Sequence, residues 1–206
     1  MFNLTELQHD ALVEIFNIGV GHAARAMSEI VNEEVTMSVP SITFVNRADA
    51  AQMLGNQDGS RVCGVSQHYE GAFATEAILM FPEDKSLDIV RLMVGESVPL
   101  KELTEMEQEA MSEIGNIILN SCVGTLANIF SQELSGSLPA YHVGTSAQIL
   151  CASGGPADAV VLMLHIDFIL ETHQIHGYVA FILDLSALQD LREQIDLYLA
   201  RIMGAG

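Results

Sequence analysis

A carboxylate and a carboxamide stand three residues apart at two places in this 206-residue chain, as Glu14 with Asn17 and as Glu113 with Asn116. Residues three apart on a helix share one face, so each pair would present both groups to the same ligand. Held on a rigid helix, such a pair can orient a water molecule and bind a lysine without a covalent intermediate. A single E-x-x-N pattern is frequent on helix surfaces and indicates little, whereas two copies in matched surroundings favour a functional role.

The two copies belong to a longer internal repeat. A shift of 99 positions places the Leu-Thr-Glu segment at 4–6 on the identical segment at 103–105, and the same register places Pro40 on Pro139. Identities at a constant offset indicate duplication of a structural unit. We therefore expect matched elements in the two halves, with each proline leading from helix into extended chain.

Each copy of the motif follows a helix-start pattern. Thr5 is followed three residues later by Gln8, and Thr104 by Glu107, which is the spacing of a capping box. Apolar residues then recur at helical spacing in both copies. The sequence predicts one helix that begins near residue 5 and a second that begins near residue 104.

The remainder of each half predicts further helices and a set of strands. Alanine-rich stretches without proline predict a second helix in each half, at 21–31 and 124–132. β-rich segments predict strands at 61–69, 72–81, 159–168 and 178–183, joined by hairpin turns at 70–71 and 173–177. Each half then returns to helix, at 86–94 and 186–200.

This order predicts an α+β fold in which helices pack on antiparallel sheet. No Gly/Ser-rich linker separates the repeats at about 1–99 and 100–206, and a half of about 100 residues buries less of its surface than the whole chain does. We expect a single domain over 1–206, built from two pseudo-symmetric halves. Because internal duplication can replace a homodimer, we also expect a monomer.

The composition excludes several classes of partner. The net charge is -19, from 27 acidic and 8 basic residues, so no basic surface is available for nucleic acid or for anionic membranes. Three cysteines at wide spacing form no C-x-x-C pair and indicate a reducing compartment. The apolar runs are too short to span a bilayer, and no secretory signal is visible. We expect a cytoplasmic protein without membrane insertion.

The histidines of the second hairpin are candidate metal ligands. His165, His173 and His176 lie close in sequence, but their spacing fits no standard ligand pattern and no cysteine or acidic cluster completes it. Exposed polar residues are frequent in hairpin turns. The sequence therefore predicts no metal site in this chain.

The first copy of the motif carries a family resemblance. Asp10, three residues, Glu14, two residues and Asn17, followed after 22 residues by Pro40, resembles the signature of the CheC/CheX/FliY family of chemotaxis phosphatases. In that signature the first position is Asp or Ser. The two copies and the chain length resemble the CheC-type members.

The second copy fits the same signature at three of its four positions. Glu113, Asn116 and Pro139 match, whereas Glu109 replaces the Asp or Ser. This departure predicts a second site that is weaker or differently tuned.

The resemblance implies a CheC-like fold, with long helices packed on antiparallel sheet, and a hydrolase acting in bacterial chemotaxis. Its substrate would be the aspartyl phosphate of a CheY-type response-regulator receiver domain. Asn17 and Asn116 would orient the attacking water, as water-positioning residues do in other phosphoryl transfers. Glu14 and Glu113 would bind the lysine of the receiver, and the prolines would support the shape of the chain.

The resemblance also bears on cofactors and partners. The receiver would hold Mg²⁺, and this chain would bind no cofactor. CheD would be a second protein partner. The alternative to catalysis is a non-catalytic adaptor that binds a receiver or a CheD-like protein.

Overall fold

The computed structural model describes residues 4–32, 34–54, 61–94, 98–152, 159–170 and 173–204. The first half of the chain contains α1 (Glu6–Val31), β1 (Val35–Asn46), α2 (Arg47–Leu54), β2 (Arg61–Gly71), β3 (Thr75–Pro82) and α3 (Glu83–Val94). The second half contains α4 (Leu100–Phe130), β4 (Leu134–Gly136), β5 (Ala140–Thr145), α5 (Ser146–Ala152), β6 (Val160–Leu170), β7 (His173–Leu183) and α6 (Leu185–Gly204). Both halves thus follow the same order, except that two strands, β4 and β5, stand where the first half has β1 alone.

The strands form one antiparallel sheet whose order is β1-β6-β7-β3-β2-β4, with β5 also paired to β2. The hairpins β2-β3 and β6-β7 meet at the centre through β3 and β7. The strands that follow each long helix pair with the hairpin of the other half. β1 pairs with β6, while β4 and β5 pair with β2. The two halves therefore share one continuous sheet.

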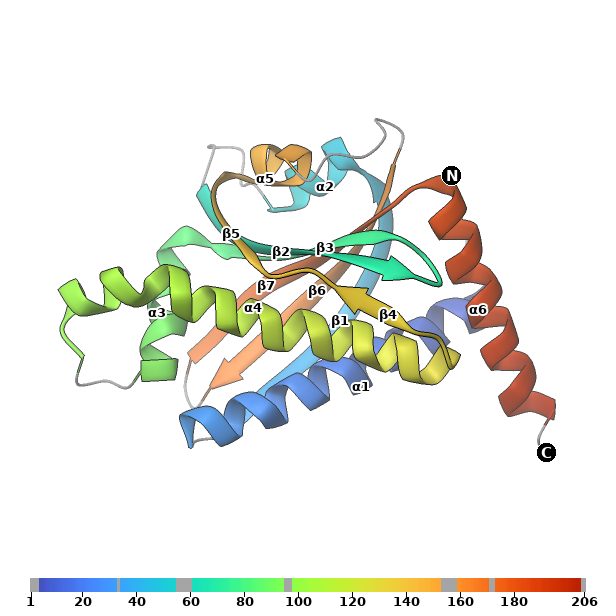
Figure 1. Ribbon diagram of the computed structural model, residues 1–206, viewed down its shortest axis with the longest axis horizontal. Coiled ribbons are helices and arrows are strands. Elements are labelled where there is room, and N and C mark those ends of the chain that lie inside the picture. Colours follow the sequence, from blue (N-terminus) through green and yellow to red (C-terminus); the bar gives the residue numbers. More distant parts are fainter. Residues whose placement is uncertain are drawn as a thin grey trace.

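Helices cover both faces of this sheet (Figure 1). The long helices α1 and α4 lie on one face and run in opposite directions, with α3 and α6 at opposite ends of their layer, whereas α2 and α5 lie on the other face. Successive side chains of β3 point to opposite faces of the sheet. Leu79 and Phe81 join the core under α1 and α4. Ile78 and Met80 join the core under α2 and α5. The predicted α+β class is confirmed.

Each long helix is continuous where the sequence analysis predicted two. The structure has a 26-residue α1 and a 31-residue α4, so the separate helices predicted at 21–31 and 124–132 are wrong. No proline interrupts the helix in these stretches, and their apolar residues pack in the same core as the earlier turns. Helical structure is confirmed at 21–31 and at 124–130, but the break is absent.

The two helix starts differ. The Thr5 hydroxyl accepts a hydrogen bond from the Gln8 amide, and the Gln8 side chain accepts one from the Thr5 amide, which confirms the predicted capping box. In contrast, α4 begins at Leu100, so the box predicted at Thr104 is wrong. The Thr104 hydroxyl donates to the Leu100 carbonyl instead.

The carboxylate of Glu107 explains this difference, because it is engaged elsewhere. It accepts hydrogen bonds from Ser86 of α3, at 2.6 Å, and from Tyr141 of β5, at 2.9 Å. Burial of Tyr141 and its hydrogen bond to Glu107 both raise the pKa of its hydroxyl above the ordinary value. Glu107 therefore fastens α4 to the neighbouring helix and strand.

The predicted strands agree with β2, β3, β6 and β7, but the turn predicted at 70–71 is wrong, because β2 continues to Gly71 and β3 begins at Thr75. β7 begins at His173, however, so the turn predicted at 173–177 is wrong and His176 lies within a strand. Pro40 lies inside β1, where the register with β6 shifts between Ser38 and Ser41, and Pro139 lies directly before β5. Both prolines lead into extended chain as predicted, and an irregular strand position tolerates their missing N–H.

Glycines allow α4 to pack closely on its neighbours. A Cβ atom added to Gly115 would lie 2.4 Å from Val65 Cγ1 on β2, and one added to Gly19 would lie 3.0 Å from Cys122 Cα on α4. Gly19 thereby permits close approach of α1 and α4. In the part of the chain that the structure describes, every helix is too short or too polar to cross a membrane.

Candidate functional site

The first copy of the motif lies on α1. Asp10 and Glu14 are exposed, and the Glu14 carboxylate makes no hydrogen bond or ion pair with another described residue. Asn17 lies one turn further along and is half-buried. The Glu14 carboxylate is therefore available to a partner, whereas Asn17 is partly shielded by its own protein.

The amide of Asn17 is fully engaged by backbone groups. Its Nδ2 donates to the carbonyls of Val13, at 3.0 Å, and of Val39, at 3.2 Å, and its Oδ1 accepts from the Val39 amide at 2.9 Å. Val39 stands at the irregular position of β1 that precedes Pro40, where no ladder pairing with β6 is formed. Asn17 thus supplies hydrogen bonds that the neighbouring strand would otherwise provide.

The second copy, on α4, has a different arrangement. Glu113 is exposed and Asn116 is half-buried. Asn116 Oδ1 accepts from Asn120 Nδ2 at 2.7 Å and from Gln67 Nε2 at 3.2 Å. Among the described residues no group accepts a hydrogen bond from Asn116 Nδ2, and this nitrogen is not buried. An amide donor therefore remains free for a ligand.

A buried network fixes the orientation of Asn116. Gln67 is 2% exposed and donates also to the Ser137 carbonyl at 2.9 Å. The Tyr69 hydroxyl lies 3.0 Å from Gln67 Oε1 and 2.9 Å from Asn120 Oδ1, so the two acceptors share its one proton, and burial raises the pKa of this hydroxyl above the ordinary value. These neighbours hold the Asn116 oxygen toward β2 and leave its NH₂ group on the outer side.

The residues before the two motif prolines differ sharply in exposure. Val39 is 2% exposed, whereas Leu138, at the equivalent position of the second half, is 89% exposed. The first segment is bound to Asn17, while the second is held by Gln67 through Ser137. The first segment therefore engages both polar atoms of the Asn17 amide, whereas the second bonds to Gln67 and leaves Asn116 Nδ2 without a partner among the described residues.

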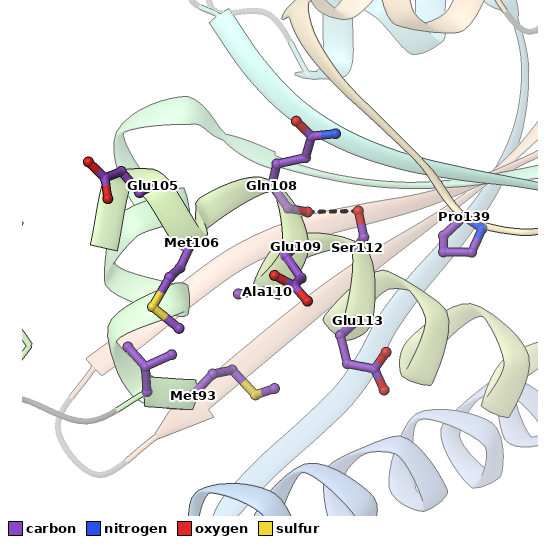
Figure 2. Close-up of a pocket in the computed structure, with 10 residues that line it drawn as sticks. Met93, Glu105, Met106, Gln108, Glu109, Ala110, Ser112, Glu113 and Pro139 are labelled. Atoms are coloured by element: carbon purple, nitrogen blue, oxygen red, sulfur yellow. Dashed lines mark hydrogen bonds between the residues drawn. The ribbon is translucent and has the colours of Figure 1, made fainter. Parts of the chain in front are cut away.

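A groove of about 690 Å³ lies along α4 beside the second copy (Figure 2). Glu109 and Glu113 project into it from successive turns of α4, and Pro139 closes one side. Its apolar part is formed by Met93 and Val94 of α3 with Met106 and Ala110 of α4, and it is also lined by Glu105, Gln108 and Ser112. The groove thus combines an apolar lining with the carboxylates of glutamate side chains.

The structure brings Glu109, Glu113 and Pro139 together at this groove, with Asn116 on the next part of α4. The sequence analysis missed Gln67 and Asn120, which orient Asn116. A glutamine inside an otherwise buried strand was a usable signal for Gln67, because buried amides require partners. Asn120 had no such signal, since the repeat places Gly21 at its position in the first copy.

Comparison with known proteins gives both sequence and structural relatives. Residues 7–43, which include the first motif copy, match the model of the CheC-like family. The chain is similar to Bacillus subtilis CheY-P phosphatase CheC, with 29% identity over 143 residues, which is 68% of each protein. It is also similar to Bacillus subtilis flagellar motor switch phosphatase FliY, with 25% identity over 139 residues, which is 66% of this chain and 36% of FliY.

Solved structures share the fold. Thermotoga maritima FliY has a TM-score of 0.77 at 18% identity, covering 96% of this chain and 100% of the FliY chain. A chain in the Borrelia burgdorferi CheX-CheY-BeF₃-Mg²⁺ complex has a TM-score of 0.52 at 18% identity, covering 84% of this chain and 97% of its own. The family-model match over residues 7–43, the two sequence relatives and the fold shared with FliY together show that this chain is similar to the CheC-type chemotaxis phosphatases.

Proposed function

We propose that this protein hydrolyses the aspartyl phosphate of a phosphorylated CheY-type receiver domain in bacterial chemotaxis. The name of the Bacillus subtilis relative, CheY-P phosphatase, supports this substrate, as does the occurrence of the Borrelia burgdorferi CheX structure in a complex with CheY. The observation that carries the proposal is the outward amide donor of Asn116, one turn after the exposed carboxylate of Glu113.

The reaction requires a water molecule in line with the phosphorus–oxygen bond that breaks. Water oxygen forms a bond to phosphorus, the bond between phosphorus and the receiver aspartate breaks, and the proton of the water leaves with phosphate or solvent. The products are a free aspartate carboxylate and inorganic phosphate. Because little covalent chemistry falls to the protein, positioning of the water is its main contribution.

In this proposal Asn116 Nδ2 donates a hydrogen bond to the water oxygen and leaves another lone pair directed at phosphorus. Glu113 binds the lysine of the receiver and so fixes the receiver on α4. The Mg²⁺ ion belongs to the receiver, and this chain supplies no metal to the reaction. The held orientation of Asn116 lowers the entropic cost of placing the water.

The groove suits a receiver surface that combines apolar and basic groups. Glu105, Glu109 and Glu113 give it negative charge, while Met106, at 41% exposure, and the nearby Leu138, at 89%, offer apolar area. Apolar contact would supply affinity, and the carboxylates would select a basic partner and speed its association.

The geometry ranks the two sites. Asn17 must give up hydrogen bonds to Val39 before it can bind water, whereas Asn116 needs no such rearrangement. We propose that the second site supplies most of the turnover, although Glu109 departs from the family signature there. Asp10 and Glu14 would form a weaker receiver site on α1, with Pro40 supporting the strand segment that covers it.

The direct test is phosphate release from a phosphorylated CheY-type receiver with Mg²⁺ present. Asn116→Ala should lower kcat by about 10²-fold, which is the usual cost of losing one positioned donor. Asn17→Ala should lower it less, and the double variant should be inactive. Glu113→Gln should raise KM because it removes the charge that binds lysine.

Asn128→Ala is the matched control, because Asn128 is an exposed asparagine further along the same helix. It should leave turnover unchanged. Binding of the phosphorylated receiver without any acceleration of its dephosphorylation would replace the phosphatase by the adaptor. Equal losses in the two single variants would reject the ranking of the sites.

A CheD-type protein as a second partner, the monomeric state and a cytoplasmic location remain part of the proposal. Each has a direct measurement: co-purification with CheD, sedimentation equilibrium of the purified chain, and cell fractionation. A CheD partner that leaves phosphatase turnover and receiver binding unaltered would have no regulatory part in it.

A further inference from the structure

We propose that His165, Asp167 and His176 form a binding site for one divalent transition-metal ion, with Zn²⁺ as the reference ion. The first two residues lie two apart on β6 and so share a face of the sheet. Strand pairing places His176 of β7 directly opposite Asp167. The register of one hairpin thus gathers side chains whose sequence spacing matched no known ligand pattern.

The ligand atoms are close to the separation that zinc requires. Asp167 Oδ1 lies 2.6 Å from His176 Nδ1 and 3.6 Å from His165 Nε2, and one ligand atom from each residue lies within 4.8 Å of the other two. Ligands bound at about 2.1 Å in tetrahedral geometry stand about 3.4 Å apart. Small side-chain rotations are therefore sufficient to admit the ion.

The site is held in place yet open to solvent. Tyr178, opposite His165 on β7, stacks on its imidazole with ring centroids 5.1 Å apart and an interplanar angle of 19°. The side chains of His165, Asp167 and His176 are 31%, 21% and 56% exposed. An ion can therefore enter, and water can fill the remaining coordination position.

The donor set indicates the class of metal. Two imidazoles with one carboxylate suit zinc and neighbouring transition metals, whereas Mg²⁺ and Ca²⁺ prefer oxygen ligands. Among the residues that the structure describes, this is the one group of three or more His, Cys, Asp or Glu side chains arranged to hold an ion.

An alternative explanation of this cluster is a simple hydrogen bond between His176 and Asp167, but it accounts for the positions of only two of the three side chains. It does not explain why the His165 ring also directs a nitrogen toward the same carboxylate oxygen. The cluster continues the β6 and β7 positions that pack under α2 and α5, on the face opposite α1 and α4. The proposed metal site is thus separate from the proposed phosphatase sites.

The test uses the full chain, purified without a histidine tag and freed of metal. Titration with Zn²⁺ should show one ion bound per chain, and Co²⁺ should give visible absorption bands of a site with nitrogen and oxygen ligands. His165→Ala, Asp167→Asn and His176→Ala should each weaken Zn²⁺ binding by at least about tenfold. NMR spectra of the wild-type chain should show the rings of His165 and His176 shifting together as Zn²⁺ is added.

His68→Ala is the matched control, because His68 also lies on a strand, is 50% exposed and contacts Glu70 and Glu76. It should leave Zn²⁺ affinity and stoichiometry unchanged. Absence of one-to-one binding by the wild-type chain would overturn the proposal, and so would affinity that survives loss of both histidines. The NMR measurement decides the matter for any variant that fails to fold.

Discussion

The side chain of Asn17 and the backbone of Val39 are hydrogen-bonded in both directions. Asn17 Nδ2 donates to the Val39 carbonyl at 3.2 Å, and the Val39 amide donates to Asn17 Oδ1 at 2.9 Å. An asparagine expected to face a receiver domain is thereby also a connector between α1 and β1. Its loss should therefore affect stability as well as the proposed chemistry.

Asn17→Ala should lower the free energy of unfolding by about 1–3 kcal/mol, because it strands the polar backbone groups of a buried residue. Urea denaturation at pH 7 measures this change. Asn116→Ala should cost less, since Gln67 keeps its hydrogen bond to Ser137 when Asn116 is removed. If both variants lose equal stability, the different hydrogen bonding of the two asparagines does not contribute to the free energy of unfolding.

Gly115→Ala should destabilise the protein by about 1–3 kcal/mol through overpacking. The added methyl group would lie 2.4 Å from Val65 Cγ1, so α4 would have to move away from β2. Thermal unfolding followed by circular dichroism measures the loss, and Val65→Ala in the same chain should recover part of it.

The control for this helix is Gly124→Ala, because a Cβ atom there meets nothing within 4 Å. This substitution should stabilise the protein by about 0.5–1 kcal/mol through helix propensity. Stabilisation by both alanines would show that α4 does not pack against β2 as described.

The three thiols should differ in their reaction with a disulfide reagent at pH 8. Cys151 is exposed, whereas Cys63 and Cys122 are both buried with 0% exposure. One thiol per native chain should therefore react quickly, and all three after denaturation in urea. Fast reaction of more than one thiol in the native chain would contradict the described core. Cys151→Ser is the control and should abolish the fast phase.

The protein should lose stability as the pH rises above about 9. Burial raises the pKa of both the Cys63 and the Cys122 thiols from 9.0 to about 12, and the Glu107 carboxylate adds to the effect at Cys63. Between these values the unfolded chain releases protons that the native chain retains, so alkali favours unfolding. Each thiol contributes a slope of at most about 1.4 kcal/mol per pH unit.

Urea denaturation at pH 7, 9 and 10 measures this slope. Cys122→Ala should be less stable at every pH, because it leaves a cavity, but its stability should fall less steeply with pH. A slope identical to that of the wild type would show that the Cys122 thiol does not contribute.

The sequence was sufficient for elements that depend on local signals. The Thr5 and Gln8 pair predicted the start of α1 correctly because both side chains find their partners within four residues. The same pattern failed at Thr104, since Glu107 is bound to Ser86 and Tyr141 from elsewhere in the chain. Local patterns cannot show which side chain a tertiary contact will recruit.

In the candidate sites, too, local spacing could be read from the sequence, whereas tertiary contacts could not. Spacing along a helix was enough to select Glu113 and Asn116, but the difference between Asn116 and Asn17 depends on Val39 and Gln67, which belong to strands. The cluster around Asp167 likewise depends on the register between β6 and β7. The roles assigned to the motif residues, and the single domain built from two repeats, stay predictions.

The exchange of first strands between the halves has a consequence for any shortened form of the chain. A polypeptide of residues 1–98 would carry β1 without its partner β6, and β2 without β5. Two copies could pair these unpaired strand edges by exchanging β1, as in a domain-swapped homodimer. Covalent linkage of the halves makes that exchange intramolecular, so the assembly of the sheet no longer depends on protein concentration.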